Sequence, residues 1–173
     1  MSLLRRDRAG FTLVEILIVV IILGVLAAVA IPRFSDFVSD GEESALDVNL
    51  SQLRKMVELY YHEHGGVYPG VVNEVNGNPV SNANQAETAF LAQVTLYSDK
   101  AGKTNNDKTA IFRYGPYVKR VGLPKNPFNK DSDITCDIVI ADIANITSDG
   151  TTGWKFYILT GRLMANDGAH DAR

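Results

Sequence analysis

The feature that most constrains this chain is an apolar run near its N-terminus, residues 11–31. Only Thr12, Glu15 and Gly24 interrupt the aliphatic and aromatic residues there. As a helix the run would be about 31 Å long, close to the hydrocarbon thickness of a bilayer. It therefore predicts a membrane-spanning helix. Its glutamate is unexpected, because an unpaired charge costs about 2.5–3.5 kcal/mol near the bilayer centre.

Charged residues are divided unevenly between the two sides of this run. Residues 1–10 hold Arg5, Arg6 and Arg8 against one aspartate. The whole chain has a formal net charge of -3, so the other 163 residues carry -5. Because basic residues favour the cytoplasmic side of a membrane, we expect a cytoplasmic N-terminus and an exported C-terminus. No basic surface indicates nucleic-acid binding, so no specific nucleic acid is expected as a partner.

One interpretation of the N-terminus is an ordinary secretory signal. The small residues Ala28–Ala30 could form its cleavage site. The mature protein would then be an exported soluble binding domain, cut near Ala30. Against this, a disposable signal has no use for the cost of placing Glu15 in an apolar segment.

A second interpretation uses every unusual residue. The stretch RAGFTLVE, Arg8 to Glu15, resembles the processing site of prepilins, the precursors of type IV pilins and of type II secretion pseudopilins. In that family a membrane peptidase cuts after the glycine, here Gly10, and the new N-terminal residue, here Phe11, is N-methylated. The family's glutamate falls on Glu15. The resemblance implies a structural filament subunit and not an enzyme.

The resemblance also implies a location and partners. The precursor would be a single-pass protein of the bacterial inner membrane with its C-terminus outside, which then enters a periplasmic pseudopilus or an extracellular pilus. The implied partners are further copies of the chain, a prepilin peptidase and methyltransferase, an inner-membrane assembly platform with a cytoplasmic ATPase, and minor pilins or pseudopilins. In the filament, Glu15 would meet the Phe11 amine of a neighbouring subunit. A slipped subunit would leave two buried ions unpaired, so this pair would set the axial offset.

Beyond the apolar run, the helix is expected to continue. Gly24 and Pro32 predict points of flexibility or bending. Apolar residues then recur at helical spacing, which predicts one buried face. They are Leu46, Leu50, Leu53, Val57 and Tyr60. The glycines and proline of HGGVYPG, residues 64–70, should end the helix.

The rest of the chain predicts a compact head. We expect exposed loops over 71–85 and 98–109, a short helix over 86–97, a strand over 134–140, and a hairpin over 154–165 turning at Thr160–Gly161. The fold class is α+β, with a long N-terminal helix packed by its second half on a small C-terminal antiparallel β-sheet, as in the type IV pilin-like fold. The predicted parts are a leader (1–10), a transmembrane or filament-core helix (11–31), an amphipathic helix (32–65) and a globular head (66–173).

Parts of the head carry the same resemblance. YYHEHGGVYP, residues 60–69, resembles the helix end of major pseudopilins, and GPYVKRVGLPKNPFN, residues 115–129, resembles a later stretch of that group. The second stretch departs at Asn126 and Asn129 and inserts Val121–Gly122. The single cysteine, Cys136, excludes the intrachain disulfide common in type IVa major pilins. A long pilus and a short pseudopilus both remain open.

Metal binding and catalysis have little support in the sequence. Major pseudopilins hold calcium in an acidic C-terminal loop, which here gives the weak candidates Asp131, Asp133, Asp167 and Asp171. Calcium needs six to eight converging oxygens, and neither stretch shows the family's loop pattern. Solvated turns and no cofactor are therefore expected.

The histidines and the cysteine do not suggest a reactive centre. His62 and His64 are two residues apart and lack the i, i+4 spacing of a zinc helix, while His170 lies near the C-terminus. Cys136 is predicted to be a small buried hydrophobic residue. No catalytic residue is predicted, and a membrane-tethered enzyme is the least supported interpretation.

Overall fold

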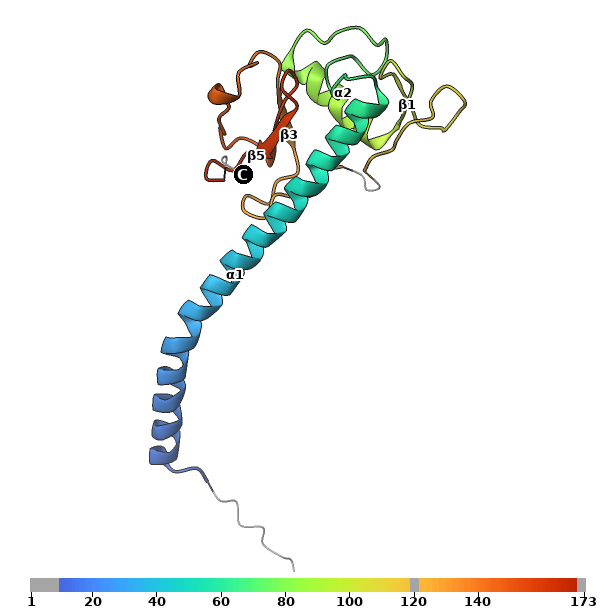
Figure 1. Cartoon of the computed structure of the whole chain (residues 1–173). Coiled ribbons are helices and arrows are strands. Elements are labelled where there is room, and N and C mark those ends of the chain that lie inside the picture. The colour runs from blue at the N-terminus through green and yellow to red at the C-terminus, as the bar shows by residue number, and fades with distance from the viewer. Residues whose placement is uncertain (1–9, 119–121, 171–173) are drawn as a thin grey trace, which may run out of the picture. The chain divides into compact units, whose positions relative to one another are not determined.

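The computed structural model describes residues 10–118 and 122–170, with side chains at all of these positions outside 32 and 34–36. The elements, in chain order, are α1 (Leu13–Glu63), α2 (Ala83–Thr95), β1 (Tyr97–Ser98), β2 (Thr104–Asn105), β3 (Ile134–Asp137), the 3-10 turn η1 (Ile143–Asn145), β4 (Trp154–Tyr157) and β5 (Arg162–Ala165) (Figure 1). The predicted α+β class is confirmed. The chain divides into two compact units, Met1–Gly41 and Glu42–Arg173, and α1 contributes to both.

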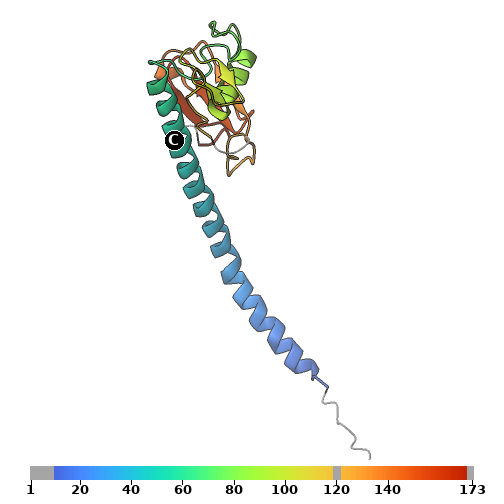
Figure 2. The ribbon, with the colours of Figure 1, turned by 90° about the vertical axis from the view of Figure 1, so that its right-hand side faces the viewer.

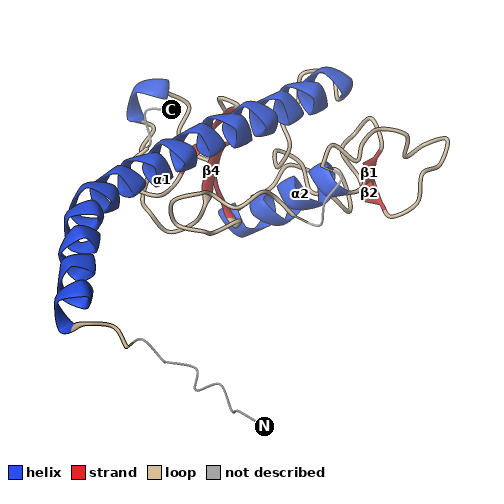
Figure 3. Cartoon of the chain, turned by 90° about the horizontal axis from the view of Figure 1, so that it is seen from below, coloured by secondary structure: helices blue, strands red, loops and turns tan. Residues whose placement is uncertain are grey.

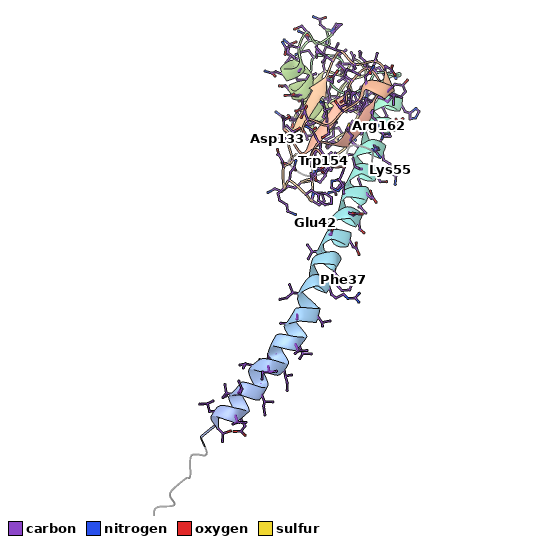
Figure 4. The ribbon with its side chains drawn as sticks, turned by 90° about the vertical axis from the view of Figure 1, so that its left-hand side faces the viewer. Phe37, Glu42, Lys55, Asp133, Trp154 and Arg162 are labelled. Carbon is purple, nitrogen blue, oxygen red and sulfur yellow. The ribbon has the colours of Figure 1, made fainter. Side chains whose placement is uncertain are left out.

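The first unit, in its described part, is the first half of α1. The helix begins at Leu13 and is assigned without interruption through Gly24 and Pro32. Figure 4 shows the side chains of this half, including Phe37, pointing outwards from the helix. A bend at the glycine or the proline stays a prediction.

The second half of α1 carries the apolar stripe of the head. Leu46, Leu50, Leu53, Val57 and Tyr60 are each at most 2% exposed, which confirms the predicted buried face. The helix ends where Gly65 and Gly66 adopt positive φ values of 71° and 87°. The Lys100 ammonium donates to the Glu63 carbonyl at 3.0 Å, so a cation lies at the helix C-terminus.

Helix α2 begins three residues before its predicted start. The Asn82 side chain caps it by accepting from the Gln85 amide at 2.9 Å. The predicted apolar face is buried at Ala86, Phe90 and Val94. The helix ends at Thr95 instead of 97, and the next residues form β1, which pairs antiparallel with β2 inside a stretch that was predicted to be only a loop.

The second sheet has the order β3-β4-β5 and is mixed. The predicted hairpin is confirmed, because β4 and β5 are antiparallel and Gly161 N donates to Tyr157 O at 2.9 Å in the turn. Strand β3, in contrast, runs parallel to β4, so the expectation of a wholly antiparallel sheet is wrong for this pair. The connection over 138–153 is too long for a tight hairpin and crosses over between strands of the same direction.

Strand β3 stops at Asp137, three residues before the predicted end. The Asp137 carboxylate accepts from the amides of Val139 and Ile140, at 2.9 and 2.7 Å. This local turn withdraws both amides from the sheet, so the apolar alternation continues past the strand without extending it.

The core of the head joins both helices to one face of the β3-β4-β5 sheet. Trp154, Phe156 and Leu163 pack there with the stripe of α1 and with Phe90 of α2. Arg54 Nε donates to Leu163 O at 3.0 Å, which ties α1 to β5. Figures 2 and 3 show the second half of α1, α2 and the sheet next to one another.

The opposite face of this sheet is covered by the connection that precedes β4. Tyr157 donates its hydroxyl to Thr147 O at 2.7 Å, and the Lys155 ammonium lies 2.7 Å from the Asp149 carboxylate. Tyr157 and Lys155 are buried on this face and Trp154 and Phe156 in the core, so all four residues of β4 are buried. The sheet is therefore covered on both sides within the head.

Candidate assembly site on the first half of helix α1

The start of α1 is built by a reciprocal cap. Thr12 Oγ1 accepts from the Glu15 amide at 3.2 Å, while Glu15 Oε2 accepts from the Thr12 amide at 2.9 Å and from the Thr12 hydroxyl at 3.0 Å. This is the capping box expected for threonine followed three residues later by glutamate. A carboxylate here also faces the positive end of the helix dipole. Glu15 therefore has a structural role that its charge alone did not reveal.

The spacing Thr12-x-x-Glu15 could have revealed this cap from the sequence. From the sequence we explained the glutamate only by its pairing with the Phe11 amine. The cap uses Oε2 twice. Among the residues that the structure describes, no donor contacts Oε1. One carboxylate oxygen therefore stays open to an outside partner.

The predicted cleavage bond lies immediately before this cap. Gly10 and Phe11 precede the helix and are exposed, Phe11 to 83%. A side chain at Gly10 would meet nothing within 4 Å. The predicted leader residues Arg5, Arg6 and Arg8 lie outside the described part of the chain. The bond between Gly10 and Phe11 is thus open to another protein in this structure.

The segment after the cap is apolar on all sides. Leu13–Ile31 is long and apolar enough to cross a membrane. Its mean hydropathy is 3.1, and its most apolar stretch is not buried within the described part of the chain. Its large apolar side chains are between 50% and 83% exposed. A helix that is hydrophobic all round needs an apolar environment, and within its own unit this segment has none. The open space around Gly24 agrees, since a Cβ there would meet nothing within 4 Å.

The calcium candidates that the structure describes form no cluster of metal ligands. Asp131 Oδ1 accepts from the Asp133 amide at 2.9 Å. Asp167 accepts from Asn126 and from the amide and ring of His170, all at 3.0 Å. Asp171 lies outside the described residues. In residues 10–118 and 122–170, no group of three or more His, Cys, Asp or Glu side chains is placed to hold a metal ion. The absence of a cofactor stays a prediction.

The remaining candidate residues belong to the second unit. Cys136 is buried, and burial raises the pKa of its thiol, as expected for a packing residue. His62 is exposed, whereas His64 is buried against Tyr60. No role was predicted for His64, because sequence spacing does not show which side chains of the head are hydrogen-bonded.

Comparisons with known proteins agree with the site at the helix start. Residues 5–31 match the family model of the prokaryotic N-terminal methylation motif. A fimbrial protein of Neisseria meningitidis is 39% identical over 151 residues, which cover 78% of this chain and 84% of the relative. The chain belongs to the type IV pilin and pseudopilin family.

Two further relatives show the breadth of this family. The type IV major pilin protein PilE1 of Neisseria gonorrhoeae is 32% identical over 107 residues, covering 57% of this chain and 49% of the relative. The type II secretion system core protein G of Vibrio cholerae is 26% identical over 150 residues, covering 86% of each. No solved structure matches the chain with significance. As a pilin-family protein, the chain is a structural subunit, and these relatives are not enzymes.

Proposed function

We propose that this chain is the precursor of a filament subunit, cut between Gly10 and Phe11 and N-methylated on Phe11. The observation that carries the proposal is an apolar helix, exposed on all sides, that begins with a capped carboxylate. Burial of such a surface is strongly favourable, and many copies of the same helix can provide it. The chain is thus proposed to be anchored in a membrane first and then to assemble with further copies of itself into a polymer.

Glu15 supplies the directional contact in the bundle. Its Oε2 is held by Thr12, which fixes the carboxylate at the helix start and leaves Oε1 for the Phe11 amine of a neighbouring subunit. Two opposite charges attract far more strongly in an apolar core than in water, and leaving either ion unpaired there is costly. The pair therefore selects one axial offset between neighbours, while the aliphatic side chains supply cohesion in any register.

The orientation and the assembly machinery follow from the same proposal. The basic leader stays cytoplasmic and the head is exported across the inner membrane. A prepilin peptidase and methyltransferase processes the leader, and a membrane platform with a cytoplasmic ATPase extracts the subunit, together with minor subunits. The relatives include pilins and a secretion core protein, so the filament is a long pilus or a short pseudopilus. Electron microscopy of sheared surface material distinguishes the two.

The role of Glu15 can be separated from that of its cap. Glu15→Gln keeps a capping side chain, because glutamine also serves at this position, but removes the charge. Thr12→Val keeps the charge and removes the cap. We expect Glu15→Gln to reduce filament yield at least about ten-fold, since an uncompensated amine remains in the bundle. Thr12→Val should reduce filament yield less than Glu15→Gln does. Loss of the cap destabilises the start of the helix by about 1 kcal/mol. Filament yield is measured by shearing and immunoblotting at matched precursor levels.

Wild-type yield from Glu15→Gln would contradict the charge-pair proposal. A larger loss from Thr12→Val than from Glu15→Gln would assign the effect to the cap. Mass spectrometry of the mature N-terminus tests the cleavage separately. A methylated Phe11 supports assembly, whereas a soluble chain that begins near Ile31 would support the alternative, a secretory signal ending near Ala30.

A further inference from the structure

A buried hydrogen-bonded cluster lies at the end of α1, far along the chain from the assembly site. His64 is 4% exposed, and its ring stacks on Tyr60 with a centroid distance of 3.7 Å and an interplanar angle of 6°. His64 Nδ1 lies 2.9 Å from Tyr60 O, and Nε2 lies 3.0 Å from Ser98 Oγ. Both ring nitrogens are therefore engaged inside the head.

The cluster continues from Ser98 to a carboxylate. Ser98 lies beside the side chain of Tyr117, and the Tyr117 hydroxyl donates to Glu63 Oε2. Ser98 is itself fixed by two backbone hydrogen bonds with Tyr114, at 3.0 and 3.1 Å. The side chains thus form a chain from His64 through Ser98 and Tyr117 to Glu63, which precedes His64 in sequence.

The neutral state of this chain satisfies every group. The Tyr60 carbonyl can only accept, so Nδ1 of His64 carries the proton and Nε2 is an acceptor. The Ser98 hydroxyl donates to Nε2, and Tyr117 donates to Glu63. Burial, followed by the hydrogen bond and charge of Glu63, raises the pKa of Tyr117. The tyrosine therefore keeps its proton and stays a donor.

One added proton can be accommodated by a single rotation. When Nε2 becomes protonated it donates to Ser98 Oγ, and the Ser98 hydrogen turns to the Tyr117 oxygen. Tyr117 still donates to Glu63, so no hydrogen bond is lost. The new imidazolium charge is balanced by the carboxylate at the other end of the chain. A serine suits this link because its hydroxyl both donates and accepts.

The surroundings oppose this protonation only in part. The pKa of His64 is lowered, mainly by burial and also by the charge of Lys100. The Tyr60 carbonyl, the charge of Glu63 and the Asp99 backbone act in the opposite direction and raise it. The titratable and charged groups facing the cluster come from α1, from the turn after β1 and from the segment before Tyr117. They are Tyr60, Glu63, Asp99, Lys100, Arg113, Tyr114 and Tyr117.

We propose that His64, Ser98, Tyr117 and Glu63 form a buried proton-binding site, through which the folded head takes up one proton in mildly acidic surroundings without losing a hydrogen bond. The site joins the end of α1 to β1 and to the segment at Tyr117. A subunit that leaves the membrane for the cell exterior meets variable acidity. This site lets the junction between helix and head tolerate it. The inference does not depend on the role proposed for Glu15.

The test is a pH titration of the full-length chain in detergent micelles, with carbon-13-labelled histidine followed by NMR from about pH 8 to pH 4. Exposed His62 provides an internal reference signal. Fluorescence of the single tryptophan, Trp154, which is fully buried, reports whether the head stays folded. We expect His64 to gain its proton reversibly while the Trp154 signal remains native.

Variants assign this behaviour to the cluster. Glu63→Gln should weaken proton binding at His64 about three- to ten-fold, because the balancing charge is removed. Tyr117→Phe should weaken it in the same direction and keeps the proposal testable if Glu63→Gln does not fold. Glu58→Gln, an equal charge change on α1 outside the cluster, should leave His64 unchanged. The proposal is overturned if His64 stays neutral until Trp154 reports unfolding, or if the variants that fold titrate like the wild type.

Discussion

The two halves of helix α1 are one continuous element with opposite surroundings. Leu13–Ile31 is apolar on every side and exposed, whereas the second half has one apolar stripe, and that stripe is buried. The stripe is covered by α2 and the β3-β4-β5 sheet of the same chain. The difference shows that the second half is a finished structure within the monomer, while the first half is stabilised by what surrounds the protein.

The strongest test of this comparison exchanges the same residue in each half. Leu53, in the stripe, is fully packed, and Leu17, in the apolar segment, is half exposed. We expect Leu53→Ala to lower the free energy of unfolding of the head by about 2–5 kcal/mol, because it leaves a cavity. Leu17→Ala should change it by less than about 0.5 kcal/mol. Trp154 fluorescence during denaturant titration in micelles measures both. A similar loss in the two variants would refute the distinction.

Glycines give a second, smaller contrast. A Cβ at Gly161, in the β4–β5 turn, would lie 2.2 Å from the Tyr68 ring, whereas one at Gly24 would meet nothing. We expect Gly161→Ala to destabilise the head by about 1–3 kcal/mol through overpacking. Gly24→Ala should leave the head unchanged and favour helix by about 1 kcal/mol. Thermal melts followed by Trp154 fluorescence compare them.

A control separates the clash from backbone strain at Gly161. Gly150 has the same φ of 71° and open space around it. Gly150→Ala should cost about 1 kcal/mol from the left-handed conformation alone. If Gly161→Ala costs no more than Gly150→Ala, the packing of Tyr68 does not limit the turn.

The smallest effect concerns the ion pair on the covered far face of the sheet. Burial opposes ionisation of Asp149, but hydrogen bonds from Lys155, Thr151 and Asn166 outweigh it and hold the pKa of this carboxyl well below its usual range. Because the pKa of Asp149 is lower in the folded protein than in the unfolded chain, its ionisation stabilises the head at pH values above the unfolded pKa of about 3.9. This stabilisation is lost as the pH falls from that value through the folded pKa. We expect Lys155→Met to cost about 1 kcal/mol at pH 7, since solvent screens the partly exposed carboxylate.

The pH dependence of that difference is the decisive measurement. The gap in melting temperature between the wild type and Lys155→Met should narrow as the pH falls below about 5, because the unfolded chain then binds a proton at Asp149 that the folded wild type does not yet bind. A gap that stays constant over this range would show that Lys155 acts only by packing.

Periodic patterns were sufficient to predict much of the head. The spacing from Leu46 to Tyr60 located the buried face of α1, and the Thr160–Gly161 turn located the hairpin. Boundaries set by side-chain hydrogen bonds were missed, at Asn82 before α2 and at Asp137 after β3. Alternation says which residues face the core, but it does not say which way a partner strand runs. The parallel pairing of β3 with β4 could not be derived from it.

The candidate site was predicted only in part for a similar reason. The motif around Gly10 and Glu15 was recognisable because it is local in sequence. The cluster of His64, Ser98 and Tyr117 joins residues up to 53 positions apart, and no spacing rule connects them. Long-range polar clusters of this kind become visible only when the head has folded.

The cap at Thr12 has a consequence for proteolysis. Among the residues that the structure describes, every hydrogen bond of the first turn is made by Thr12, Glu15 or residues after them, on the far side of the bond that joins Gly10 to Phe11. If the leader is removed as proposed, these hydrogen bonds all remain. On that proposal, the new N-terminus keeps a helix start that is already formed before a neighbouring subunit binds.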